Sequence, residues 1–312
     1  QAAAMIEAAQ QGNLAVQQYL TYNVYQAYEG VHAARAYIKV AEQAKVTADE
    51  FVRTTKNLMD EGVVVRSEYL TAKVHQSMAE VELLKAQGQE QIAFDSLRML
   101  MNLEAGAPIE VAERFDLELS VDSAEELLGM AMSNPKLEAQ RKEAASSVFE
   151  VDAAKAEFYP NFNVMLRQEW NDDSLSLANG SYTIAGVVSW KITDFGVTSS
   201  SVDMANASAQ QKRAKVHSEE NKLRLEVLTS WHKMQVAKKQ VQSDLLAVQQ
   251  ASEAQKLIMK RYKGGVSTMT EVLATQTQLD KARAHLAAAQ YDLNVYKAKI
   301  RLATGTMDIQ SL

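Results

Sequence analysis

The chain has 312 residues, no cysteine, and a net charge of −6 from 39 acidic and 33 basic side chains. Without cysteine there is no disulfide framework, thiol nucleophile or thiolate metal site. The mildly acidic balance makes nucleic acid a poor partner, and no apolar run reaches the roughly 18 residues that a transmembrane helix needs. Only three prolines and twelve glycines interrupt the chain, which is typical of long helices or coiled coils.

The first predicted element is a helix over residues 6–59, interrupted only by Gly12 and Gly30. At about 1.5 Å per residue, such a helix is on the order of 80 Å long. Ordinary globular helices are several-fold shorter, so this one needs a coiled-coil neighbour along its length. A tight reversal over residues 60–66 follows, and a second helix, which we expect Ser67 to cap, runs to about Asn102.

The segment over residues 109–134 differs from the helical part before it. It is acidic, alternates at Phe115–Leu119 as an extended segment does, and then enters a short helix that we expect Asp122 or Ser123 to cap. We interpret it as a connector. After it, Pro135 opens a further helix that ends near Glu157.

Residues 158–196 contain two stretches of alternating apolar and polar side chains, on either side of a polar loop at 171–180. Two segments of period two predict a β-hairpin with about ten residues in each strand. Its apolar side consists of Phe162, Val164, Leu166, Ile184 and Val188.

Trp170, Tyr182 and Trp190 lie near the ends of these predicted strands, which is the pattern of a membrane-spanning strand with an aromatic belt. The alternative is a soluble hairpin packed on helices. Because an isolated hairpin is barely stable, and no other segment of the sequence is rich in strand formers, we expect the hairpin to pair with strands outside this chain.

The helical pattern resumes over residues 197–262, reverses at 263–265 and returns as a helix over 270–303. This second half repeats the first at an offset of 265 − 62 = 203 residues, which aligns Gly62 with Gly265. The same offset aligns Val63 with Val266, Glu68 with Glu271, Leu70 with Leu273, Leu83 with Leu286, and Arg98 with Arg301. A repeat of about 200 residues indicates a duplicated half-molecule rather than a short-period solenoid.

No motif for catalysis or cofactor binding accompanies these elements. The five histidines are isolated, and the sequence contains neither a glycine-rich phosphate loop nor a Gly-x-Ser-x-Gly motif. We expect the acidic residues to lie on solvated helical faces, where they pair with basic neighbours. The sequence therefore predicts a protein that is not an enzyme and has no cofactor, metal or catalytic residue.

Several short motifs together resemble the TolC family of outer-membrane efflux proteins, and the resemblance covers essentially the whole chain. They are Asn134–Ala139, Phe158–Phe162, Trp190–Gly196, Arg261-Tyr262 ahead of Gly265, and the terminal Leu302–Gly305. The resemblance implies a mainly α fold with a β-hairpin. Long antiparallel coiled-coil helical hairpins would form a trimeric α-barrel, and the strands would contribute to a 12-stranded transmembrane β-barrel.

In that family each repeat carries one β-hairpin, whereas this chain has only the second one. By the offset of 203, Gln1 corresponds to Met204, which follows the hairpin. We therefore expect the first hairpin to precede Gln1.

The resemblance also implies four regions and a function. Residues 1–106 would form the first periplasmic helical hairpin, 107–157 an equatorial connector and helix, 158–196 the transmembrane β-hairpin, and 197–312 the second periplasmic helical hairpin. The protein would be the outer-membrane exit duct of a tripartite efflux pump or a type I secretion system. The alternative is a soluble coiled-coil scaffold without channel activity.

Partners and location follow from the same resemblance. The chain would be a homotrimer in the outer membrane of a Gram-negative bacterium, with most of each copy in the periplasm. Its partners would be outer-membrane lipid, a periplasmic adaptor protein and an inner-membrane pump. The two reversals would lie at the periplasmic entrance, where Gly62, Val63, Gly265 and Val266 would contact the adaptor, since glycine permits a positive φ and a close backbone approach.

The family closes this entrance through links near the reversals. Tyr262, Ser67 and Glu68 occupy the matching positions, so we expect them to form the entrance gate. An arginine of the family's network is replaced here by Ser267, and the nearby Arg66 is a candidate substitute.

Glu271 matches the first of two acidic positions that ring the closed entrance in the family, and Ala274 occupies the second. Three Glu271 carboxylates near a narrow axis would attract cations and raise one another's pKa. The alternative is that Glu271 and Glu68 are ordinary first-turn carboxylates stabilised by the helix dipole.

Overall fold

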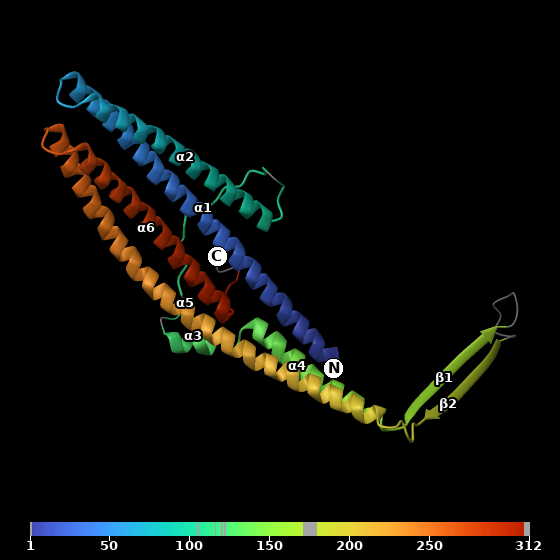
Figure 1. Cartoon of the computed structure of the whole chain (residues 1–312). Coiled ribbons are helices and arrows are strands. Elements are labelled where there is room, and N and C mark those ends of the chain that lie inside the picture. The colour runs from blue at the N-terminus through green and yellow to red at the C-terminus, as the bar shows by residue number, and fades with distance from the viewer. Residues whose placement is uncertain are drawn as a thin grey trace. The chain divides into compact units, whose positions relative to one another are not determined.

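A computed structural model describes residues 2–104, 106–115, 117–119, 121, 123–170 and 180–308. Its elements are α1 (Ala2–Asp60), α2 (Arg66–Leu100), α3 (Ala124–Ala131), α4 (Pro135–Ala156), β1 (Asn161–Trp170), β2 (Gly180–Ser189), α5 (Val197–Lys263) and α6 (Met269–Thr304) (Figure 1). The candidate cap Asp122 and residues 171–179 of the predicted loop at 171–180 lie outside the described residues, and Gly180 begins β2.

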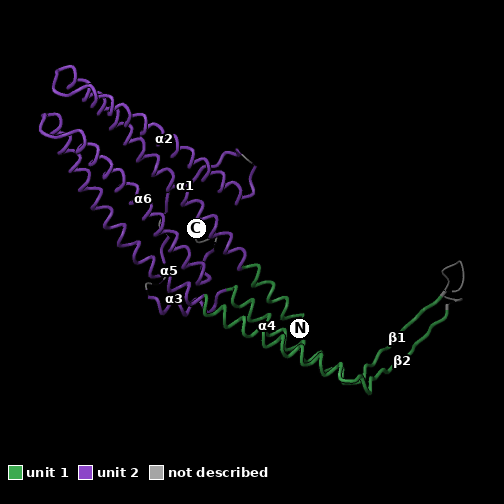
Figure 2. The backbone as a smooth tube through the Cα atoms, viewed as in Figure 1, with its two compact units in different colours: residues 1–14, 135–222 green, residues 15–134, 223–312 purple. Residues whose placement is uncertain are grey.

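The chain divides into two compact units, which are described in turn (Figure 2). One comprises residues 1–14 and 135–222, and the other comprises residues 15–134 and 223–312. Helices α1 and α5 each contribute to both units.

The helices match the predicted ones, with ends that differ by a few residues at most. Ser123, one of the two predicted candidates, occupies the N-cap position of the short helix α3, but its side chain makes no capping hydrogen bond. The prediction that Ser67 caps α2 is wrong, because the helix already begins at Arg66 after an N-cap residue, Val65, that has no capping side chain. Within the described ranges, no helix combines the length and the apolar character needed to cross a membrane.

In the larger unit, four helices lie in the order α2, α1, α6, α5 (Figure 1). Side-chain contacts join each neighbouring pair. Gln76 on α2 donates to Asp49 on α1 at 2.7 Å, and Asn294 on α6 donates to Glu29 on α1 at 2.9 Å. Lys299 on α6 lies 3.6 Å from the carboxylate of Glu226 on α5.

A segment between α2 and α3 crosses from α1 to α6, and we call its residues Glu113, Arg114, Phe115 and Leu117 the strap. Tyr28 on α1 donates a hydrogen bond to the Glu113 carbonyl at 2.8 Å. Leu117 is buried in an apolar cluster formed by Tyr25 on α1, Ala298 on α6, and Met307 after it. The strap therefore fastens the two central helices together through the protein core.

The charge at the centre of this contact is the Glu29 carboxylate, whose side chain is completely buried. Arg114 of the strap donates to it twice, at 2.6 and 3.0 Å. Tyr25 and Asn294 donate to the other carboxylate oxygen at 3.1 and 2.9 Å. The expectation that acidic residues lie on solvated faces is therefore wrong for Glu29, where four hydrogen bonds replace the water that a buried charge loses.

In the smaller unit, ion pairs join α4 to the first part of α5 and to α1. Arg141 on α4 donates to Glu138 at 2.6 Å and to Glu220 on α5 at 2.7 Å. Lys142 donates to Glu7 on α1 at 2.6 Å. Such solvent-accessible pairs contribute roughly 0–1 kcal/mol each.

The same unit carries the predicted β-hairpin, in which β1 and β2 form a two-stranded antiparallel sheet. Phe162 pairs with Val188, and Leu166 pairs with Ile184, so the apolar positions share one side as the alternation predicts. That apolar side is exposed in the single chain.

We predict that Arg114→Ala lowers the free energy of unfolding by about 3 kcal/mol, because it leaves the buried Glu29 charge without its cationic partner. Urea unfolding followed by far-UV circular dichroism measures the change. The control is Arg35→Ala. It removes the ion pair between Arg35, which is exposed, and Glu90, and we expect it to lower the free energy of unfolding by less than about 1 kcal/mol. Equal effects of the two substitutions would contradict a special role for the strap.

Candidate functional site

The two helical reversals end in the same backbone arrangement. At the first, Gly62 has a φ of 75° and Gly265 at the second has a φ of 70°. The amide of Val63 donates to the Leu58 carbonyl at 2.8 Å, and that of Val266 donates to the Arg261 carbonyl at 2.9 Å. These are the bonds of a Schellman cap, which needs glycine at the left-handed position.

The two reversals are also neighbours in space. A Cβ added to Gly265 would lie 4.0 Å from a methyl carbon of Val63. Val63 and Val266 are both exposed, at 54% and 70%. The four residues predicted to contact an adaptor therefore form one apolar surface at the end of the larger unit, and the contact itself stays a prediction.

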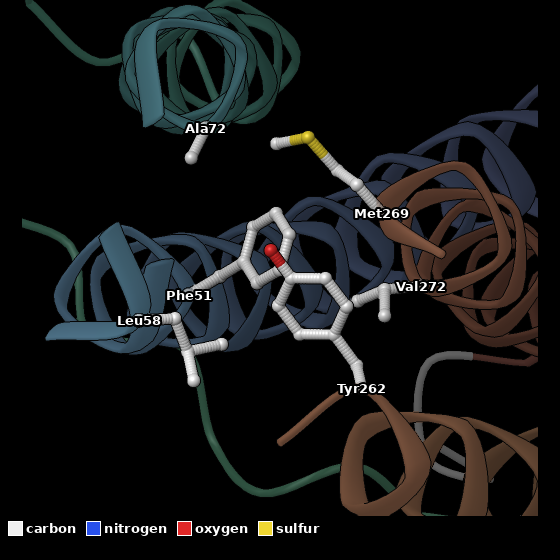
Figure 3. Close-up of a cluster of buried hydrophobic side chains, with 6 residues drawn as sticks. All are labelled: Phe51, Leu58, Ala72, Tyr262, Met269 and Val272. Atoms are coloured by element: carbon white, nitrogen blue, oxygen red, sulfur yellow. The ribbon is translucent and has the colours of Figure 1, made fainter. Parts of the chain in front are cut away.

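Behind the reversals lies a cluster of buried side chains, which we call the tip cluster (Figure 3). It contains Phe51 and Leu58 from α1, Ala72 from α2, Tyr262 from α5, and Met269 and Val272 from α6. The rings of Phe51 and Tyr262 pack with their centroids 5.5 Å apart. Because all four helices contribute, the tip cluster joins the two helical hairpins at this end.

Tyr262 also makes a polar link within this cluster. Its hydroxyl donates to the Glu68 carboxylate on α2 at 3.0 Å and lies 3.5 Å from the Thr55 hydroxyl on α1. Burial raises the pKa of Tyr262, and the nearby Glu68 charge adds to the effect. The phenol is therefore protonated at neutral pH and acts as the donor.

The structure thus brings together two of the predicted gate residues, Tyr262 and Glu68. The third, Ser67, is exposed, and its backbone carbonyl accepts a hydrogen bond from the Thr71 hydroxyl at 2.9 Å. Thr55 was not predicted, because its partner Tyr262 lies 207 residues away in the chain.

Glu271, the predicted ring residue, makes local contacts in the single chain. It forms a capping box with Thr268: the Glu271 amide donates to the Thr268 hydroxyl at 3.3 Å, and the Thr268 amide donates to the Glu271 carboxylate at 3.2 Å. The Ser267 hydroxyl also donates to this carboxylate. That hydrogen bond, then the Thr268 amide, lower the pKa of Glu271, so the exposed group is charged at neutral pH.

The predicted rise in the pKa of Glu271 concerns three copies around an axis and stays a prediction. The Thr-x-x-Glu spacing of Thr268 and Glu271 is a capping-box signature, so this role was visible in the sequence, although it was not predicted. Within the described residues, no group of three or more histidine and acidic side chains is placed to hold a metal ion.

Comparison with known proteins places this arrangement in a family. The sequence profile of the outer membrane efflux proteins matches residues 130–306, which run from α3 to the end of α6. The chain belongs to the outer membrane efflux protein family. This membership confirms the predicted family resemblance, and it agrees with the prediction that the protein is a transport duct rather than an enzyme.

Solved structures of outer membrane efflux proteins have the same fold. The outer membrane protein VceC of Vibrio cholerae is 21% identical, with a TM-score of 0.85 over 97% of this chain and 74% of its own. The outer-membrane channel OprN is 19% identical, with a TM-score of 0.86 over 97% and 69%. The MtrE channel of Neisseria gonorrhoeae is 20% identical, with a TM-score of 0.80 over 97% and 71%. A comparison with curated protein sequences gives no significant match.

Proposed function

We propose that this outer membrane efflux protein is the exit duct of a tripartite efflux pump or a type I secretion system. It conducts substrates passively, and an inner-membrane pump supplies the energy. The observation that carries the proposal is the hydrogen bond from Tyr262 to Glu68. It connects the two helical hairpins beside the reversals, where a tube made of such hairpins needs a contact that can break and re-form.

Exposed apolar side chains support assembly with further copies. One group follows α2: Leu70, Val74, Met78, Val81, Leu84, Ile92 and Met99. Another follows α5: Leu225, Val236, Leu246 and Leu257. The two groups lie on the two outer helices of the larger unit, so α2 of one copy can pack against α5 of the next copy. Such head-to-tail contacts close into a ring when the rotation between neighbouring copies allows it. We propose a homotrimer, the state typical of the family.

The β-hairpin supports a location in the outer membrane of a Gram-negative bacterium. Its apolar side is exposed, and its two outer edges need strands from other copies, since a bilayer leaves no water for unpaired backbone groups. Tyr182 and Trp190 are exposed near the strand ends, and Trp170 ends β1. We propose that these three aromatic residues form the interfacial belt and that the helical regions 1–106, 107–157 and 197–312 lie in the periplasm.

The apolar surface formed by Val63 and Val266 is the proposed contact for a periplasmic adaptor. It lies on two caps whose glycines are exposed, and exposed apolar groups such as Val63 and Val266 favour a protein partner. The proposed gate lies directly behind it, so an adaptor bound here would act on the link between Tyr262 and Glu68.

We predict that replacing Val63 and Val266 by Glu reduces export by at least tenfold while trimers still form, because the charges oppose burial against an adaptor. Export is measured as drug resistance in cells, and assembly is measured by cross-linking. As a control, Val46→Glu places the same charge at an exposed position on α1. Normal export by the double variant would rule out docking at this surface.

We predict that Tyr262→Phe combined with Glu68→Ala raises the conductance of the channel in planar bilayers severalfold, because the link that joins the hairpins is lost.

In the same bilayers, we predict that Glu271→Gln, which keeps a capping acceptor but removes the charge, lowers the preference for cations. The control is Tyr296→Phe on α6, which loses a hydroxyl away from the reversals. If the Tyr262→Phe, Glu68→Ala double variant has wild-type conductance and Glu271→Gln has wild-type selectivity, the gate lies elsewhere.

We predict that Val188→Arg destabilises the membrane-inserted protein by about 2–4 kcal/mol, because it places a charge on the side of the hairpin that faces lipid. Resistance of the trimer to heating in detergent measures the loss. The matched control is Val187→Arg, one residue earlier and on the opposite side of the hairpin, which we expect to be tolerated. If the two substitutions behave alike, the assignment of the lipid-facing side is wrong.

A further inference from the structure

His32 lies beside the strap on α1, one helical turn after Glu29. Its ring packs edge to face against the ring of Tyr28, with the centroids 4.6 Å apart, and it forms a hydrogen bond with the backbone of Ala112, just before the strap. The Nε2 atom of the ring is buried and has no hydrogen-bond partner among the described residues. The site therefore suits a neutral ring, in which one nitrogen carries no proton and need not donate.

A proton on His32 is unfavourable while the strap is in place. It would turn Nε2 into a buried donor without an acceptor, and it would add a positive charge close to Arg114 of the strap and Arg35 on α1. Burial is the largest cause that lowers the pKa of His32, and the two arginine charges act in the same direction. The charge of Glu29 and the hydrogen bond with Ala112 oppose them.

The helices packed around this contact contribute polar groups of their own. From α6 these are two uncharged amides: Asn294 donates to Glu29 at 2.9 Å, and Gln290 accepts from the strap arginine at 3.4 Å. From α2 comes Glu90, which is paired with an arginine of α1 at 3.2 Å. The carboxylate whose charge acts on His32 is therefore Glu29, and the strap occupies it.

We propose that the strap is an acid-sensitive fastener in which Glu29 exchanges partners, binding Arg114 when His32 is neutral and His32 when its ring is protonated. The two residues are three positions apart on one helix, a spacing at which opposite charges can pair. When the strap leaves, water reaches His32, and a protonated ring gives the carboxylate a cationic partner again. Acid thus lowers the cost of releasing the strap, which otherwise leaves Glu29 unpaired. The exchange does not depend on channel activity, so it can fail without affecting the conductance experiments.

The direction of the pH dependence follows from the two environments of His32. Its pKa is lowered while the strap is closed and returns to the ordinary value of about 6.5 in water. The open form therefore binds a proton more readily, and pairing with Glu29 strengthens this preference. Closure of the strap is fully favoured above about pH 6.5 and is lost progressively as the pH falls below that value.

The test detects the open strap with a single thiol, since the chain has no cysteine of its own. Leu117, which is 2% exposed, is replaced by Cys, and the purified full chain in non-ionic detergent reacts with a dithiodipyridine. The rate is divided by that of a free thiol at the same pH, so the quotient measures how often the strap opens. We expect this quotient to rise about tenfold from about pH 7.5 to about pH 5. With His32→Gln, whose amide stays neutral, we expect a change of less than about twofold.

Two controls show whether the effect is specific. His232→Gln removes an exposed histidine on α5 in the same unit and should leave the rise unchanged, and a Cys at Ala72, which is buried in the tip cluster, should show no rise. Far-UV circular dichroism checks that each variant is folded, and His32→Phe, which keeps a ring against Tyr28, replaces His32→Gln if the latter is not. A quotient at Leu117→Cys that does not change with pH, or that rises equally without His32, overturns the proposal. An equal rise at Ala72→Cys also overturns it, because acid would then open the whole unit.

Discussion

The buried carboxylate of Glu29 is the contact on which the larger unit depends most. A charge without water requires donors on both oxygens, and here they come from three separate parts of the chain: α1 itself, the strap and α6. None of these parts can move away alone without exposing or orphaning the charge. The contact with Glu29 thereby fixes the axial register of α1 against α6. It also fixes the position of the strap, because Arg114 must reach Glu29.

The two contacts between the helical hairpins, at the strap and at the reversals, are of different kinds. At the strap, separation would leave a buried charge unpaired, which costs several kcal/mol. At the reversals, separation breaks one hydrogen bond between Tyr262 and Glu68 and uncovers part of the tip cluster. A single hydrogen bond contributes only about 1 kcal/mol net, and somewhat more when one partner is charged. Breaking the hydrogen bond between Tyr262 and Glu68 alone therefore costs less than leaving Glu29 unpaired, whereas separating the reversals fully would also expose the buried side chains of the tip cluster.

The sequence predicted the features that arise from local patterns. Long stretches without proline give the helices, period two gives the hairpin and its apolar side, and the aligned glycines give two identical caps. What it did not predict are the pairs that only the fold brings together. Glu29 and Arg114 are separated by 85 residues, and neither lies in a motif that singles it out among the acidic and basic residues of long helices. The predicted N-cap, Ser67, lies two residues after the observed one, Val65, which is the usual uncertainty in assigning the end of a helix.

The duplication shows how two equivalent positions acquire different roles. Glu68 and Glu271 occupy the same place in the two repeats, three residues after Val65 and Thr268, respectively. Thr268 has a hydroxyl, so Glu271 is held in a capping box at the start of α6. Val65 offers no such partner, and α2 begins without a side-chain cap. The Glu68 carboxylate is therefore available to Tyr262. One difference at the N-cap thus separates a carboxylate that stabilises its own helix from one that links the two hairpins. The link therefore runs from Tyr262 on α5 to Glu68 on α2. The other repeat has no counterpart of this link, because Met59 stands there in place of Tyr262.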